Sequence, residues 1–330
     1  MTEIMSIFLF VVGLVLIIKG GDWFVDASIW IARVTGIPSI IVGATIVSFA
    51  TTLPELLVST NATLKGSTDI AIGNAIGSVI CNMGLIAGLI IFLRPVGVSR
   101  KIFTQKALLM IFVTLLTAFM ARENFLSTVE AVILLGTMAL YFYINIKAYQ
   151  GSMGSEKPLF TNTRREVLVY IGKFSLGSLL VILGADLLVT HGIVLAEIIG
   201  VPESVIGLTL IALGTSLPEL VTGITSVLKK DSGIGLGNII GANILNISLI
   251  LGASGLLAGD GLYMTLTDIS FLGFTGEDIP QTLLLDIPVS LALMGILTVP
   301  PMLKGKTYRL QGAGLMLLYG IYVIILFNLG

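Results

Sequence analysis

Apolar stretches long enough to cross a lipid bilayer recur along nearly the whole chain, and this feature restricts the possible fold most strongly. A membrane-spanning helix needs about 20 mainly apolar residues. Ten such spans are predicted, at residues 4–32, 38–64, 70–93, 102–120, 126–147, 166–195, 203–228, 232–258, 282–302 and 309–329. Only 11% of the 330 residues are charged, against about a quarter in soluble domains. We therefore expect an all-α, multi-pass protein of the cell (inner) membrane, in contact with the lipid bilayer.

The composition argues against several functional classes. A net charge of −1 excludes a basic nucleic-acid-binding protein. With one cysteine, Cys81, and one histidine, His191, the chain can form neither an internal disulfide nor a Cys- or His-rich zinc site. It has no GxSxG or HExxH motif, so an intramembrane enzyme is the weakest hypothesis and no cofactor is expected. Met1–Ser6 has no basic residue and precedes a long apolar run, so no cleavable signal peptide is expected.

A polar, basic segment divides the chain into two similar halves. Residues 148–165 form a predicted cytoplasmic linker between a first half, 1–147, and a second half, 166–330, each with five spans. Within them, residues 20–88 align without a gap with residues 184–252, at a constant offset of 164. The identical pairs include Asp22/Asp186, Pro38/Pro202, Gly43/Gly207, Thr51/Thr215, Pro54/Pro218, Glu55/Glu219, Gly73/Gly237, Asn74/Asn238 and Asn82/Asn246. Because five is odd, the second copy is expected to be inverted, which is typical of secondary transporters, although duplicated membrane proteins also include channels.

The distribution of Lys and Arg predicts the orientation in the membrane. If the N-terminus lies outside, the inner loops hold fifteen basic residues and the outer loops only Lys65 and Arg122. By the positive-inside rule, both termini are therefore expected outside. The loop of Lys65 is then outside while its repeat counterpart, with Lys229 and Lys230, is inside, as an inverted repeat requires. The acidic segment 258–281 is expected to be a solvated connection.

The second and seventh spans share a motif with a proline and a glutamate near the expected middle of the membrane. Residues 43–55 read GATIVSFATTLPE, and residues 207–219 read GLTLIALGTSLPE. Because Pro54 and Pro218 have no N–H, carbonyl oxygens of the preceding turn lose their helical partners. At membrane depth, such carbonyls are tolerated only where they line a cavity or bind something. The motif therefore predicts an intramembrane binding site.

The glutamates of this motif are predicted to be functional. Thr51 and Glu55 are four residues apart and share a helix face, as do Thr215 and Glu219. Each helix thus offers hydroxyl, carbonyl and carboxylate oxygens together. No basic residue in the neighbouring repeat segments is available to pair with the glutamates, and intramembrane carboxylates are functional by default.

The third and eighth spans carry a second repeated motif. Residues 73–82 read GNAIGSVICN, and residues 237–246 read GNIIGANILN. Their glycines are expected to allow close helix approach. Ser78 and Asn82 are four residues apart, and Asn246 is the counterpart of Asn82. Carboxylate, carbonyl, hydroxyl and amide oxygens form a hard site that suits Ca²⁺ and Na⁺ rather than softer metals.

A repeated charge lies outside these motifs. Asp22 recurs as Asp186, and both a functional role and a role in fixing helices remain open. Lys19 lies one turn before Asp22 and is expected to be neutralised by it.

The four motif blocks, in this order and spacing, resemble the two alpha repeats of the sodium/calcium exchanger family, which belongs to the cation/calcium antiporter superfamily. The pattern is similar to the prokaryotic members, which lack a large regulatory loop. The resemblance implies that Na⁺ and Ca²⁺ are the transported ions, that three Na⁺ exchange for one Ca²⁺, and that spans one and six slide as a gating pair. It implies the following roles: Glu55 and Glu219 bind Ca²⁺ and share Na⁺; Thr51 and Thr215 offer carbonyls to Ca²⁺; Ser48 and Ala212 offer carbonyls to Na⁺; Thr52 and Ser216 are the hydroxyl residues beside them; Ser78 binds Na⁺; Asn82 and Asn246 form a central polar pair.

This chain departs from the family pattern at two places. Ala242 stands where the first copy has Ser78, so one hydroxyl ligand is missing from the second copy. Asn246 stands where some relatives, including potassium-dependent exchangers, carry Asp, and this disfavours potassium coupling.

Three functional hypotheses follow. The first is a sodium-driven calcium antiporter that works as a monomer, and the second is a proton-coupled calcium antiporter in which the glutamates carry protons. The third is a cation channel. Sodium-dependent flux separates the first two, and currents above antiporter turnover would identify the third.

Overall fold

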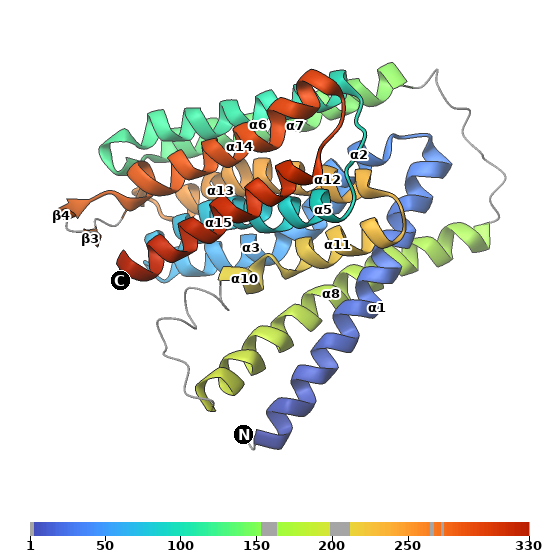
Figure 1. The fold of residues 1–330 in the computed structure, drawn as a ribbon, viewed down its shortest axis with the longest axis horizontal. Coiled ribbons are helices and arrows are strands. Elements are labelled where there is room, and N and C mark those ends of the chain that lie inside the picture. The colour runs from blue at the N-terminus through green and yellow to red at the C-terminus, as the bar shows by residue number, and fades with distance from the viewer. Residues whose placement is uncertain (1–2, 153–163, 199–211, 265–266, 272–273, 330) are drawn as a thin grey trace. The chain divides into compact units, whose positions relative to one another are not determined.

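The computed structural model describes residues 3–152, 164–198, 212–264, 267–271 and 274–329, and the fold is helical (Figure 1). The helices of the first half are α1 (Glu3–Thr35), α2 (Ser39–Val42), α3 (Ser48–Leu64), α4 (Thr68–Cys81), α5 (Gly88–Leu93), α6 (Arg100–Met120) and α7 (Thr128–Ser152). Those of the second half are α8 (Arg164–Ile198), α10 (Ala212–Thr215), α11 (Leu217–Leu228), α12 (Ser232–Leu245), α13 (Leu251–Leu257), α14 (Ile287–Lys304) and α15 (Arg309–Leu329).

Wide π-helical turns join several of these helices into longer rods. They are η1 (Gly43–Val47) between α2 and α3, η2 (Asn82–Ala87) between α4 and α5, η5 (Asn246–Ile250) between α12 and α13, and η6 (Thr282–Asp286) before α14. A short 3₁₀ turn, η3 (Ala121–Glu123), follows α6. Single π-helical turns inside α-helices are rare and occur frequently at functional sites.

The described residues contain nine helical rods long and apolar enough to cross a membrane. They coincide with nine of the ten predicted spans, with ends that differ by a few residues. The remaining predicted span, 203–228, is described from residue 212 onward, as α10 and the apolar α11. The prediction of a helical, multi-pass membrane protein is confirmed. The count of ten spans, the inversion of the repeats and the outside termini stay predictions.

Contacts between residues divide the chain into two compact units. The first unit comprises residues 1–51 and 147–238, and the second comprises 52–146 and 239–330. The boundaries fall inside three helices, α3, α7 and α12. Each unit therefore contains a part of each sequence half. The division into halves at 148–165 stays a prediction about repeats, and α7 and α8 extend into that linker to Ser152 and from Arg164.

In the first unit, α1 and α8 pack side by side along their length (Figure 1). Glycines on both helices allow this contact: a Cβ added at Gly20 would lie 2.8 Å from the carbonyl oxygen of Gly177, and one at Gly184 2.8 Å from that of Gly13. Such close approach through small residues is a common way for membrane helices to associate. The pair corresponds to predicted spans one and six.

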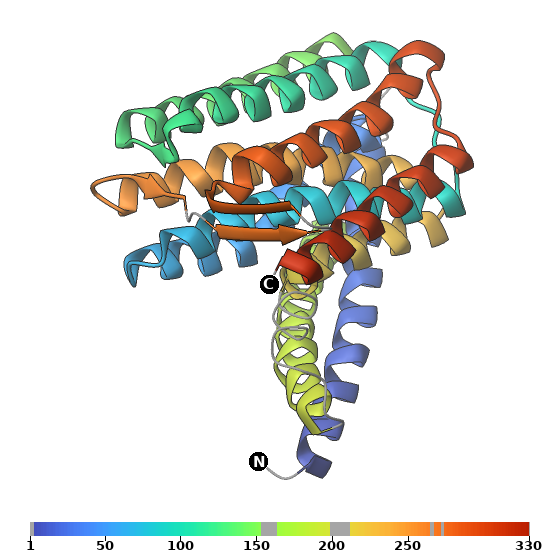
Figure 2. The same ribbon diagram turned by 60° about the vertical axis from the view of Figure 1, so that its left-hand side comes forward.

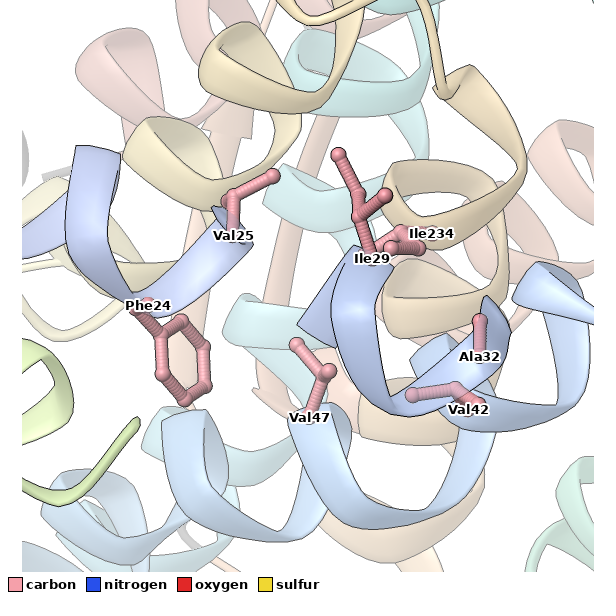
Figure 3. Packing of buried hydrophobic residues seen from close by; sticks show 7 residues of the cluster. All are labelled: Phe24, Val25, Ile29, Ala32, Val42, Val47 and Ile234. Carbon is pink, nitrogen blue, oxygen red and sulfur yellow. The ribbon is translucent and has the colours of Figure 1, made fainter. Parts of the chain in front are cut away.

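An apolar cluster of the first unit lies on α1, and Phe174 of α8 packs against it. It joins α1 to α2, η1 and α12, as Figure 3 shows. Its buried members are Phe24, Val25, Ile29, Ala32, Val42, Val47 and Ile234. Within a membrane such contacts stabilise through van der Waals packing, because lipid tails are as apolar as these side chains. The cluster fixes the start of α3, and with it the first site motif.

In the second unit, α15 packs against η2 and α5, and α14 packs against α6. Tyr319 of α15 lies against Gly84 of η2, where an added Cβ would lie 2.5 Å from the tyrosine Cβ. The buried ammonium of Lys106 on α6 donates a hydrogen bond to Asn145 of α7. Buried polar groups in a membrane need such partners because lipid offers none.

Short strands occur in the connections of the second unit, which the sequence did not predict. β1 (Phe125–Leu126) pairs antiparallel with β2 (Leu262–Tyr263). β3 (Thr267–Phe271) and β4 (Phe274–Ile279) form an antiparallel pair, drawn as two adjacent arrows in Figure 2. Their register shifts between Thr267 and Ile269. The described residues of the acidic segment 258–281 therefore include three strands, β2, β3 and β4.

Candidate functional site

The first motif lies on α3 and on the π-helical turn before it. η1 ends at Val47, and Ser48 begins α3, which continues through Pro54 without a break. Ser48, Thr51, Thr52 and Glu55 are all buried, with at most 3% of each residue exposed. Ser48 and Thr51 belong to the first unit, and Thr52 and Glu55 to the second. The carboxylate of Glu55, which the sequence places near the middle of the membrane, is thus buried.

The same motif in the second half interrupts the helix instead. α10 runs from Ala212 to Thr215, and α11 starts at Leu217 with Pro218 in its first turn. Ser216 between them has φ −89° and ψ 6°, outside helical geometry. Glu219 and Ser216 are fully buried in the first unit, and Thr215 is partly buried. Residues 207–211 of the motif lie outside the described residues.

The two predicted asparagines each begin a π-helical turn: η2 starts at Asn82 and η5 at Asn246. Both side chains are fully buried in the second unit, where α4 packs against η5. Neither amide has a hydrogen-bond partner among the described residues. The same holds for the buried hydroxyls of Ser78, Thr52 and Ser216.

These orphaned groups fit hard cations as substrates. An unpaired buried polar group costs about 1–3 kcal/mol, and almost all such groups in proteins have a partner. Amide and hydroxyl oxygens are the ligands that Na⁺ and Ca²⁺ accept. No cluster of three or more His, Cys, Asp and Glu side chains occurs in the described part of the chain.

Two further asparagines support the motifs, and the sequence analysis gave them no role. Asn74 donates to the Glu55 carbonyl oxygen at 3.2 Å and to Ser59 Oγ at 2.9 Å, both within the second unit. Asn238 accepts a hydrogen bond from Thr51 Oγ1 at 3.1 Å within the first unit. Their recurrence at equivalent repeat positions was the signal that could have identified them.

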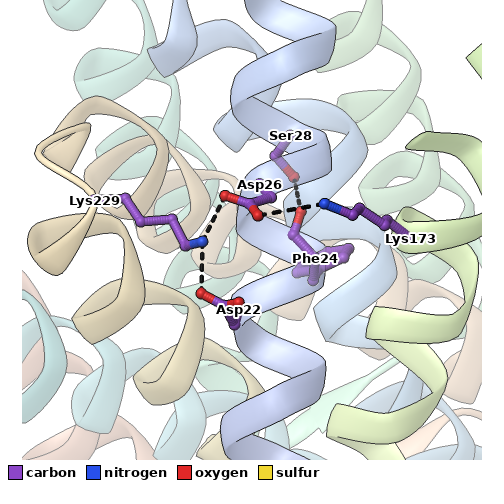
Figure 4. Close-up of polar contacts among 6 residues, drawn as sticks. All are labelled: Asp22, Phe24, Asp26, Ser28, Lys173 and Lys229. Atoms are coloured by element: carbon purple, nitrogen blue, oxygen red, sulfur yellow. Dashed lines mark hydrogen bonds and ion pairs between the residues drawn. The ribbon is translucent and has the colours of Figure 1, made fainter. Parts of the chain in front are cut away.

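Charged side chains of the first unit form an ion-pair cluster on α1, shown in Figure 4. Lys229, just after α11, reaches Asp22 at 2.6 Å and Asp26 at 2.5 Å, and Lys173 of α8 lies 3.6 Å from Asp26. Burial lowers the pKa of Lys229, but the two carboxylates more than offset this and raise it above its usual value. The prediction that Asp22 neutralises Lys19 is wrong, because the carboxylate pairs with Lys229. The cluster ties α11, which carries Glu219, to α1.

The described residues give different surroundings to the glycines of the second motif. An added Cβ at Gly237 would lie 2.4 Å from the Ile40 carbonyl oxygen, which confirms the prediction for α12. At its repeat counterpart Gly73, and at Gly77, no heavy atom of the described residues lies within 4 Å of an added Cβ. For these two positions close helix approach stays a prediction.

This contrast supplies a matched pair of variants. Gly237→Ala should lower the Tm of the purified protein by roughly 3–10 °C, because the backbone of α2 cannot yield without loss of packing. Gly73→Ala should leave the Tm unchanged or raise it, because alanine favours helix. Thermal unfolding in detergent measures both. Equal Tm values for the two variants would contradict the close contact at Gly237.

Membrane-spanning rods with buried carboxylates and unpaired amides at helix interruptions define a transporter of cations. A family model described as sodium/calcium exchanger protein matches residues 5–147 and 169–328. The chain belongs to the sodium/calcium exchanger family, and it is a cation/Ca²⁺ antiporter of the membrane.

Individual relatives agree with this assignment. The chain is 29% identical over 354 residues to sodium/calcium exchanger MaX1 of Methanosarcina acetivorans, with 96% of each chain covered. It is 36% identical over 256 residues to inner membrane protein YrbG of Escherichia coli, covering 76% of this chain and 79% of the relative. A solved structure of the sodium-calcium exchanger NCX_Mj superposes with a TM-score of 0.81 at 29% identity, covering 98% of this chain and 99% of the other.

Proposed function

We propose that the protein exchanges Na⁺ for Ca²⁺ by alternating access, with three Na⁺ moving against one Ca²⁺. The observation that carries the proposal is the set of buried, unpaired oxygen donors at the repeated motifs, at Thr52, Ser78, Asn82, Ser216 and Asn246. Relatives whose names include sodium/calcium exchange support it. The transported ions are the only ligands that the proposal requires.

In this proposal, Glu55 and Glu219 supply the negative charge that Ca²⁺ needs, and the carbonyls of Thr51 and Thr215 complete its ligands. The carbonyls of Ser48 and Ala212 and the hydroxyl of Ser78 serve Na⁺. Thr52, Ser216, Asn82 and Asn246 are the polar neighbours that hold both ions. Both glutamates are fully buried, so a bound cation would be shielded from water and strongly attracted.

Ala242 alters one part of this set. It is fully buried and lies in α12 at the position equivalent to Ser78. The second copy therefore lacks a hydroxyl that the first copy has. We propose that the corresponding Na⁺ is held by fewer protein oxygens.

The deciding experiment is uptake of radioactive Ca²⁺ by proteoliposomes loaded with Na⁺. Uptake that requires the outward Na⁺ gradient supports the proposal. Uptake driven by a proton gradient without Na⁺ would identify a proton-coupled antiporter. Ca²⁺ flux without any counter-ion, at rates far above antiporter turnover, would identify a channel.

The proposed inverted arrangement has a direct topological test. Lys65 and Lys230 are exposed and lie in equivalent loops of the two repeats. In a Cys81→Ala background, Lys65→Cys should react with an impermeant thiol reagent from outside, whereas Lys230→Cys should react only from inside. Labelling of intact and opened cells measures this. Labelling of both positions from the same side would refute the inverted repeat.

A further inference from the structure

The polar face of α11 extends beyond the predicted site residues. Glu219, Thr222, Ser226 and Lys229 lie within an arc of about 80° on this helix and at its end, and span about 15 Å along the axis. We call these four residues the α11 polar face. Three of them are fully buried, and Lys229 is largely buried. The opposite side carries Leu217 and Val221. These two side chains pack against a small apolar cluster of Ile17 on α1 and Val181 and Ala185 on α8.

Thr222 belongs to the buried hydroxyl residues that make no hydrogen bond among the described residues. Other buried hydroxyls donate to a backbone carbonyl one turn earlier, as do Ser28, Thr63, Thr114, Thr117, Ser248 and Thr298. Thr222 Oγ1 is buried and has no hydrogen-bond partner among the described residues. It shares this state with Thr52, Ser78 and Ser216, the hydroxyls of the proposed ion site, and with Ser6, Ser232, Ser254 and Ser290. Of the last group, none lies on the helix face of either glutamate, whereas Thr222 lies one turn from Glu219 on the same face.

The neighbouring hydroxyl on the same face behaves differently. Ser226 Oγ donates to the Gly223 carbonyl oxygen at 2.7 Å, and an added Cβ at Gly235 of α12 would lie 2.3 Å from it. Ser226 is therefore used in local structure and helix packing. In the first repeat, the position of Thr222 is Val58, which is 42% exposed. The repeated architecture thus does not require a hydroxyl at this position.

The charges at the far end of the polar face do not oppose a cation. Lys229 is paired with Asp22 and Asp26, and Asp26 is also close to Lys173. Two carboxylates and two ammonium groups give this cluster a formal charge of zero. A cation that leaves Glu219 toward this end therefore meets no net repulsion from it.

We propose that the Thr222 hydroxyl is a further binding position for partly dehydrated Na⁺ or Ca²⁺, one helical turn from Glu219 on the path toward Lys229. This rests on the proposed cation exchange and extends it to a transit position. The Thr222 oxygen replaces a water ligand as the ion moves between Glu219 and the aqueous phase on the Lys229 side.

Three variants test the role of the hydroxyl. Thr222→Val keeps the shape and removes the oxygen, Thr222→Ser keeps the oxygen, and Ser226→Ala removes the control hydroxyl. The apparent KM for Ca²⁺ is measured from each side in right-side-out and inside-out vesicles. Thr222→Val should raise the KM on the Lys229 side by about tenfold, about 1.4 kcal/mol, because the partly dehydrated ion loses an oxygen ligand there. Thr222→Ser and Ser226→Ala should leave it close to the wild-type value.

The proposal is overturned if Thr222→Val leaves the KM unchanged, changes it equally from both sides, or is matched by Ser226→Ala. A second measurement does not depend on exchange. In a Cys81→Ala background, Thr222→Cys should react with a small cationic thiol reagent from the Lys229 side, and Ca²⁺ or Na⁺ should slow the reaction. A cysteine that is unreactive or unprotected refutes the transit position. Failure of sodium-driven uptake in the wild type would instead refute the proposed function.

Discussion

Glu55→Gln and Glu219→Gln should each reduce sodium-driven Ca²⁺ uptake by about a hundredfold or more, because two charges 4 Å apart attract by roughly 4 kcal/mol at an effective dielectric constant of 20. The amide keeps the size of the side chain and removes its charge. Since both carboxylates are fully buried, water cannot replace the lost attraction. Uptake of radioactive Ca²⁺ by proteoliposomes with equal amounts of purified protein measures the effect.

The matched control for these variants is Glu123→Gln. Its side chain is 81% exposed and lies in the short η3 turn, so uptake should equal that of the wild type. The Tm of each variant checks that the fold is kept. Substantial uptake by either buried variant, at a normal Tm, would remove that glutamate from the centre of the mechanism.

Exchange should also respond strongly to membrane potential. The predicted motifs contain two carboxylates, Glu55 and Glu219, because Asn82 and Asn246 are neutral. One Ca²⁺ would cancel their charge of −2, and three Na⁺ would exceed it by one. An empty carrier with charge −2 is costly to bury in the membrane, which favours coupled exchange. A potential of 100 mV acting on one charge is worth about 2.3 kcal/mol, or about fiftyfold in the Ca²⁺ gradient.

Sodium-loaded proteoliposomes with valinomycin and external K⁺ test this expectation. K⁺ entry makes the interior positive, and the exit of three Na⁺ for one Ca²⁺ then carries the excess charge outward. Interior-positive vesicles should therefore take up Ca²⁺ faster than vesicles at zero potential. Vesicles with equal K⁺ on both sides control for a direct effect of K⁺. Uptake that is indifferent to the potential would rule out three-for-one exchange.

The sequence predicted the rods well because their length is set by the bilayer and their composition by lipid. The predicted span 309–329 is α15 (Arg309–Leu329), and 282–302 is η6 with α14, ending at Lys304. Glu55, Glu219, Asn82 and Asn246 were selected from the sequence because each lies in a motif that occurs in both halves, and all four side chains are buried. Their roles as ligands stay predictions.

The sequence did not predict interactions between residues far apart in the chain. Lys19 and Asp22 are one turn apart, yet Asp22 pairs with Lys229, because the packing of α11 against α1 brings that ammonium closer. The same limit applies to Gly73 and Gly237, which are equivalent in sequence but differ in whether another backbone of the described residues lies nearby. Strand pairing between Phe125–Leu126 and Leu262–Tyr263 also depends on tertiary contacts.

The π-helical turns that begin at Asn82 and Asn246 separate two parts of each helical rod: the part before the turn carries a site motif, and the part after it packs against a neighbouring helix. Each turn holds one residue more than an α-helical turn, so the helix beyond it is rotated in phase by about 100°. Before the first turn, α4 carries Ser78; after it, Gly84 and Gly88 meet Tyr319 and Met316 of α15. After the second turn, Gly252 meets Leu135 of α7. A deletion of one residue within either turn would restore a regular α-helix and turn the glycines away from these neighbours. The proposed ion binding and the helix packing of each rod therefore both depend on one inserted residue.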